Sequence, residues 1–72
     1  MSKFRFSLSN TEGRHEGVID GPTFTDVVDS LWEHVNVRQG DVLEIGVNGF
    51  PPARFRCAAK LLTGKPMWSM AA

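Results

Sequence analysis

The segment Lys3-Phe4-Arg5-Phe6-Ser7-Leu8-Ser9 alternates strictly between polar and apolar side chains. In an extended chain, Phe4, Phe6 and Leu8 point to one side and the polar residues point to the other. A period of two over this length is typical of a strand with one buried face. The segment therefore predicts a domain built around a β-sheet.

A turn and a second strand are expected directly after this segment. Residues 10–13, Asn-Thr-Glu-Gly, supply turn chemistry, and residues 14–20 can return as an antiparallel hairpin partner. The second strand has a weaker pattern, because only Val18 and Ile19 are strongly apolar and Gly17 lies inside it. The following Asp-Gly-Pro sequence is expected to end it.

Residues 24–36 have the spacing of an amphipathic helix. Their apolar side chains recur every three or four residues and form one stripe, made of Phe24, Val27, Val28, Leu31, Trp32 and Val35. Thr23 and Asp26 stand at the spacing of a capping box, which predicts that the helix begins near residue 24. Gly40 is expected to lie beyond its end.

Residues 41–47 alternate again and predict a third strand. Its inward-pointing residues are expected to be Leu43, Ile45 and Val47. Asn48-Gly49 is a strong turn signal, but Pro51 and Pro52 follow at once and cannot donate hydrogen bonds to a tight ladder. A simple two-residue hairpin is therefore not expected.

Residues 53–62 fit two interpretations. A strand would place Ala53, Phe55, Cys57 and Ala59 on one face, whereas a helix would form a stripe from Phe55, Ala58, Ala59 and Leu62. Local chemistry favours the helix. Pro52 suits a first helical position, no residue in the segment is β-branched, and Gly64 with Pro66 resembles a helix stop.

These elements predict an α+β fold in one small domain, residues 1–72. The expected order is β-β-α-β followed by a C-terminal helix or a fourth strand. The sheet contains an antiparallel hairpin and is covered on one face by helix.

Composition narrows the class of protein. The single cysteine, Cys57, cannot form an internal disulfide, and no apolar run reaches the ~18 residues that a membrane span requires. Residues 1–6 contain no apolar run of signal-peptide length. We therefore expect a cytoplasmic protein that does not contact membranes.

Charge is segregated along the chain although the formal net charge is zero. All eight acidic residues lie between Glu12 and Glu44, together with only two arginines, which gives this stretch 2 − 8 = −6. Residues 1–11 carry +2, and residues 45–72 carry +4 with no acid. Such segregation indicates a protein with differently charged surfaces.

The candidate catalytic residues do not form a recognisable constellation. His15, His34 and Cys57 lack zinc-ligand spacing, so no metal or other cofactor is expected. Neither histidine is placed to activate Cys57, and Glu33 and His34 are adjacent residues that point about 100° apart on a helix. We do not expect an enzyme.

These observations favour a small non-catalytic protein-binding module, of the accessory or inhibitor type, that covers a surface of a larger protein or complex. A homodimer is also compatible with them. The residues expected at the interface are Asp26, Asp29 and Glu33 on an acidic face, and Phe50, Met67 and Trp68 as apolar anchors. Trp68 fits two roles, either a staple folded onto the core or an anchor for the partner.

The alternative is a nucleic-acid-binding protein that uses a basic patch from the two chain ends. The residues of that patch are Arg5, Arg54, Arg56, Lys60 and Lys65. Two features weaken this interpretation. The chain is neutral overall, and the phenylalanines of residues 3–9 point away from the basic side chains of the same segment.

Overall fold

The alternating N-terminal segment forms a strand paired on both sides. In the computed structural model, which describes residues 2–47 and 49–70, this strand is β1 (Ser2–Asn10). β2 (Gly13–Gly21) returns antiparallel to it, with Phe4 opposite Ile19. The Asn10 side-chain oxygen accepts hydrogen bonds from the backbone N–H groups of Glu12 and Gly13, at 2.8 and 3.1 Å, and closes the turn. The predicted hairpin is confirmed.

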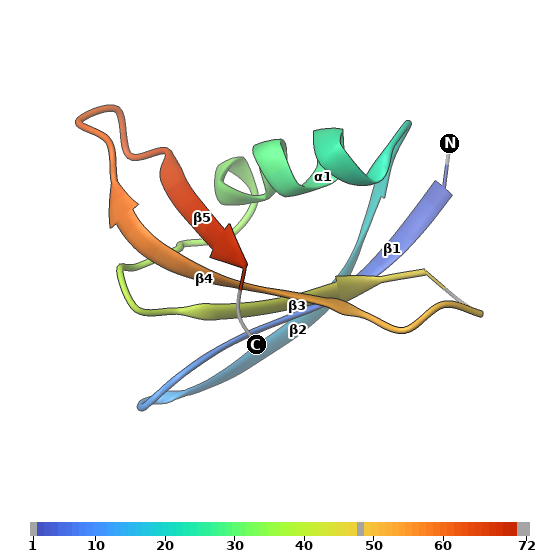
Figure 1. Ribbon diagram of the computed structural model, residues 1–72, viewed down its shortest axis with the longest axis horizontal. Helices are drawn as coiled ribbons and strands as arrows, with labels where there is room; N and C mark the ends of the chain where they lie inside the picture. Colours follow the sequence, from blue (N-terminus) through green and yellow to red (C-terminus); the bar gives the residue numbers. More distant parts are fainter. Residues whose placement is uncertain (1, 48, 71–72) are drawn as a thin grey trace.

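Three further strands complete one antiparallel sheet. β3 (Val42–Gly46) pairs with the other side of β1, β4 (Ala53–Lys60) pairs with β3, and β5 (Pro66–Met70) pairs with β4. The strand order is therefore β2-β1-β3-β4-β5 (Figure 1). The chain is a small compact single domain that is mostly sheet, so the α+β prediction is confirmed only in outline.

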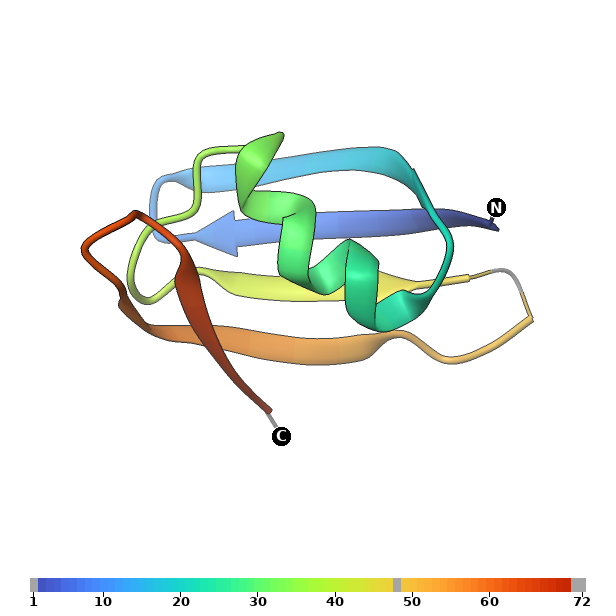
Figure 2. The same cartoon turned by 90° about the horizontal axis from the view of Figure 1, so that it is seen from above.

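The short helix α1 (Phe24–Ser30) crosses one face of the sheet (Figure 2). The Thr23 hydroxyl caps it by accepting a hydrogen bond of 3.2 Å from the Asp26 N–H, as the capping-box spacing predicts. The predicted apolar stripe packs on the sheet. The buried core residues are Phe4, Phe6, Leu8, Val27, Val28, Leu31, Val37, Leu43, Ile45 and Cys57.

The helix is shorter than the predicted span of residues 24–36. It ends at Ser30 and tightens into a 3₁₀ turn, η1 (Leu31–Glu33), in which the Leu31 carbonyl accepts hydrogen bonds from the N–H groups of His34 and Val35. The next residues, Val-Asn-Val, have low helix propensity. Leaving the helix here also allows Val37 to reach the core, where it is buried.

The preference for a C-terminal helix is wrong, and the strand interpretation of this segment is confirmed for Ala53–Lys60. β4 places Phe55 opposite Leu43 and buries Cys57 completely. The helical stripe would instead have left Cys57 off the apolar face. Pairing with the open side of β3 outweighs local propensity here, because strand preference depends mainly on cross-strand packing.

The helix-stop residues form the turn of a β-hairpin. The Leu61 N–H donates to the Lys65 carbonyl and the Gly64 N–H donates to the Leu61 carbonyl, both at 2.9 Å. Gly64 has a φ of 94°, a conformation that glycine adopts readily. This turn leads into β5, a strand that the sequence pattern did not predict.

The third strand forms as predicted, with Leu43 and Ile45 fully buried. Gly49 has a φ of 91°, and the Phe50 N–H donates to the Val47 carbonyl at 3.3 Å. The connection then runs through the two prolines and reaches β4 at Ala53. As expected, the two strands are not joined by a two-residue hairpin. Asn48 lies outside the described residues.

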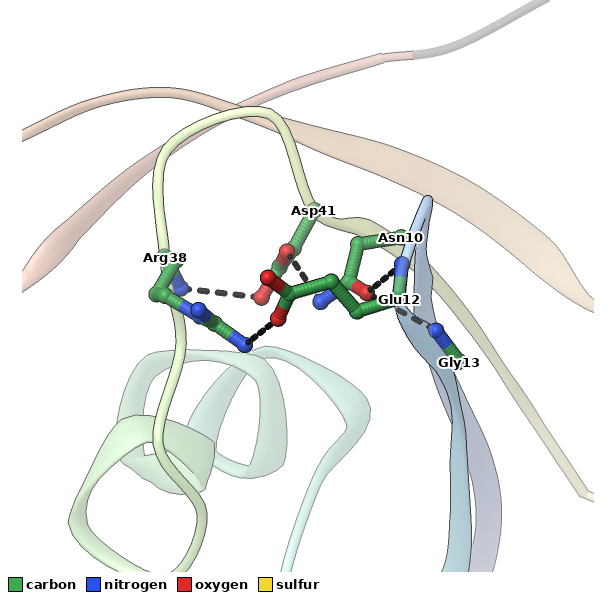
Figure 3. A network of polar contacts seen from close by, with 5 residues as sticks. All are labelled: Asn10, Glu12, Gly13, Arg38 and Asp41. Carbon is green, nitrogen blue, oxygen red and sulfur yellow. Dashed lines mark hydrogen bonds and ion pairs between the residues drawn. The ribbon is translucent and has the colours of Figure 1, made fainter.

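A polar network joins the β1–β2 turn to the loop before β3 (Figure 3). The carboxylate of Asp41, a residue only 2% exposed, accepts hydrogen bonds from the Asn10 side-chain amide at 3.0 Å and from the Arg38 N–H at 2.9 Å. The Arg38 guanidinium in turn forms an ion pair of 2.8 Å with Glu12 on the surface. Both Asp41 oxygens are therefore used to fix the loop against the hairpin.

We expect Asp41→Ala to lower the free energy of unfolding by about 2 to 3 kcal/mol, because two donors lose a charged, buried acceptor. Urea denaturation monitored by circular dichroism measures this change. Glu12→Ala is the matched control, since it removes only an exposed ion pair and should cost less than about 1 kcal/mol. Equal losses in the two variants would contradict the structural role assigned to Asp41.

Candidate functional site

The uncovered face of the sheet gathers three of the predicted basic residues. Since Phe4, Phe6 and Leu8 point toward α1, Arg5 points to the opposite face. Arg54 and Arg56 also point to this face, because they alternate along β4 with Phe55 and Cys57, which point inward. Lys60 and Lys65 lie elsewhere, at the hairpin that joins β4 to β5.

Acidic side chains interrupt this basic face. Glu44 lies in register between Ser7 and Arg54 and forms an ion pair of 3.3 Å with Arg54. On β2, Glu16 forms an ion pair of 2.8 Å with Arg14. Among the described residues, the side chains on this face are polar or aliphatic and none is aromatic. The face therefore lacks both a continuous cationic track and a stacking platform for bases.

The predicted acidic residues lie on the opposite side of the molecule. Asp26, Asp29 and Glu33 are all exposed on the outer surface of the helical segment. Residues 22–37 contain no lysine or arginine to neutralise them. The two broad sides of the domain thus differ in charge, as the charge segregation in the sequence suggested.

The three predicted apolar anchors do not form one patch. Phe50 is 72% exposed in the loop before β4, whereas Met67 lies on β5 opposite Ala59, near the other end of β4. Eight residues of strand place these ends ~26 Å apart. Phe50 and Met67 therefore belong to different surfaces.

Trp68 is half-buried and packs against the core. It is therefore neither a fully buried staple nor a fully exposed anchor for a partner. It lies opposite Cys57 on the inner face of β5. Its indole N–H is buried and has no acceptor within the described part of the chain. The ring fixes β5 on the core and leaves the edge of the strand open.

The β4–β5 hairpin carries an apolar surface that sequence reasoning missed. Leu62 at the turn is fully exposed, and Leu61 and Met67 beside it are 49% and 52% exposed. We call these three residues the hairpin surface. The helical interpretation of residues 53–62 places Leu62 on a buried stripe. The run Thr63-Gly64-Lys65-Pro66 was the signal for a turn that could have exposed it.

The structure brings the two histidines to one groove. His15 on β2 and His34 after η1 both line an open groove of about 500 Å³, together with Phe6, Gly17 and Val35. Histidine is a common zinc ligand, but structural zinc sites use four ligands. No group of three or more ligating side chains occurs among residues 2–47 and 49–70.

Cys57 has the environment of a packed thiol. It is completely buried, and its Sγ donates a hydrogen bond of 3.3 Å to the Ala59 carbonyl. Burial raises the pKa of the thiol, the negative charge of Asp41 raises it further, and Lys60 opposes both effects. A raised pKa keeps the thiol protonated at neutral pH, which removes the thiolate that a nucleophile requires.

The raised pKa of Cys57 predicts a loss of stability at alkaline pH. Above the ordinary thiol pKa the unfolded chain releases this proton while the folded chain retains it, so the free energy of unfolding decreases as pH rises. Between about pH 8 and about pH 10 the wild type should lose more stability than Cys57→Ala, measured by urea denaturation. Parallel pH profiles for the two proteins would contradict this assignment.

No helix of the described residues is long and apolar enough to cross a membrane. Comparison of the chain with family models, curated proteins and solved structures finds no match in any of the three.

Proposed function

We propose that the chain is a small non-catalytic protein-binding module that covers a surface of a larger protein through the hairpin surface. One observation carries the proposal. Of the six large hydrophobic residues exposed in the described structure, three lie within residues 61–67 and form the hairpin surface. Apolar side chains concentrated in one short stretch are typical of an interaction site, whereas single exposed ones are ordinary.

The surroundings of the hairpin surface support this use. Leu61 and Met67 point to the same face of the hairpin. Leu61 pairs with Lys65 and Met67 pairs with Ala59, and paired residues share a face, as do residues two apart on one strand. Lys60 and Lys65 flank the apolar tip. An apolar centre with a polar rim is the usual composition of a protein interface.

The acidic helical surface is suited to orient the partner. The ring of Trp32 lies beside Gly64, where an added Cβ would be 3.8 Å from ring atom Cζ3. The end of the helical segment that carries Glu33 is therefore next to the hairpin. Asp26, Asp29 and Glu33 would speed association with a basic partner surface, while the leucines would slow dissociation.

The double variant Leu61→Ser/Leu62→Ser tests the proposal. It should abolish the enrichment of the partner when the tagged protein is used for affinity capture from a lysate of its native cells. Val18→Ser is the matched control, because Val18 is 59% exposed but lies on β2, at the far edge of the sheet. Capture that is equally strong with the double variant, or equally weak with wild type, would contradict the proposal.

The interrupted basic face leads to a second expectation, on nucleic acids. We expect no appreciable binding to short random DNA or RNA even at about 50 mM salt, where phosphate contacts are strongest. Fluorescence anisotropy measures this directly. Binding that weakens by orders of magnitude toward about 200 mM salt, and that Arg54→Glu and Arg56→Glu remove, would favour the nucleic-acid function instead.

A further inference from the structure

The free edge of β5 exposes defined backbone groups. The Cys57 N–H donates to the Asp41 carbonyl and the Cys57 carbonyl accepts from the Gly40 N–H, each at 2.9 Å, so both groups of Cys57 point away from β5. Its partner Trp68 must then direct its own N–H and carbonyl away from β4. By alternation, Met70 does the same and Ser69 faces β4.

Pro66 marks where this open edge begins. Pro66 also points its backbone away from β4, because the adjacent pair is closed by the hydrogen bond from the Leu61 N–H to the Lys65 carbonyl. Pro66 has no N–H and is buried. Trp68 and Met70 therefore supply the edge that another strand can reach.

We propose that this edge pairs antiparallel with the same edge of a second copy of the chain, about a two-fold axis at Ser69. In this register Trp68 of one copy lies opposite Met70 of the other. Each such pair exchanges two N–H···O=C hydrogen bonds, and the axis generates the pair twice. The 75% exposed Met70 side chain then covers the half-buried ring of Trp68 on the partner copy, a favourable sulfur–aromatic contact.

Charge favours a second copy as the occupant of this edge. The five residues of β5 carry no ionisable side chain, so self-pairing places no like charges opposite each other. The antiparallel arrangement directs the two hairpins to opposite ends of the joint sheet. Lys65 of one copy is then ~26 Å from Lys65 of the other, well beyond the screening length of about 8 Å at physiological salt.

The opposite edge of the sheet differs in this respect. β2 carries Arg14, His15, Glu16 and Asp20 and contains Gly17. Charged side chains are one of the features by which edge strands resist pairing with other chains. β5 carries no charged residue; its protections are its length of only five residues, Pro66, and the β-bulge between Cys57 and Ala59 on the neighbouring β4. The proposed register uses only the residues beyond Pro66.

Sedimentation velocity of the full chain tests the proposal. An interface this small belongs to the weak class, so we expect a dimer with a dissociation constant of about 10 to 100 µM. Met70→Pro removes an outward N–H without touching the β4 ladder, and Met70→Lys places like charge in the interface. Each should raise the dissociation constant at least about tenfold.

Met67→Lys is the matched control, because it makes the same change on the same strand at a residue whose backbone faces β4. It should leave the dimer unchanged while weakening capture of a partner protein through the hairpin surface. Conversely, Met70→Lys should leave that capture unchanged. The failure of one proposal is thereby distinguished from the failure of the other.

Two results would overturn the inference. One is a wild-type chain that stays monomeric up to about 500 µM. This result overturns the inference even if the β5 edge of the monomer binds a strand of another protein. The other is a dimer that persists in both Met70 variants. In the expected dimer, amide exchange measured by NMR slows with protein concentration at Trp68 and Met70 but not at Ser69.

Discussion

The central strand β3 is the constraint on which the other elements depend. Its backbone bonds to β1 on one side and to β4 on the other, while Leu43 and Ile45 are fully buried beneath the helix layer. Cys57 and Asp41 continue the β4 ladder one step before β3 begins, and the Asp41 side chain fixes the preceding loop. One short strand therefore positions the N-terminal hairpin and the C-terminal hairpin relative to each other.

The elements with a self-contained pattern could be predicted from the sequence. The alternation of residues 3–9 and the stripe that begins at Phe24 each require one buried face, and each pattern is complete within its own segment. Residues 53–62 differ because the local signals suit either state. Their conformation is decided by the open side of β3, a long-range condition that a local pattern does not contain. β5 was missed for the same reason, since five residues without alternation become a strand only by pairing with β4.

The wrong assignment of residues 53–62 also limits which exposed residues can be predicted from the sequence. A helix over residues 53–62 would bury Leu62 on its apolar stripe, whereas the hairpin carries Leu62 at its turn. The acidic residues were placed correctly on an exposed surface because they belong to a predictable helix. The hairpin surface depends on the pairing of β4, so it was less predictable than the core.

The two proposed uses of residues 61–70 involve different sides of the same hairpin. Leu61, Leu62 and Met67 lie at the turn and on the outer face, while pairing with a second copy would use backbone groups on the edge at Trp68 and Met70. A two-fold axis at Ser69 would point the two turns in opposite directions and leave both hairpin surfaces open. Such a dimer would present two equivalent partner sites, separated by on the order of 40 Å. A partner that itself carries repeated binding sites would then be held far more tightly than by one hairpin, because the second contact forms within an existing complex. Weak self-pairing along a short uncharged edge and a small apolar contact surface would in that case reinforce each other.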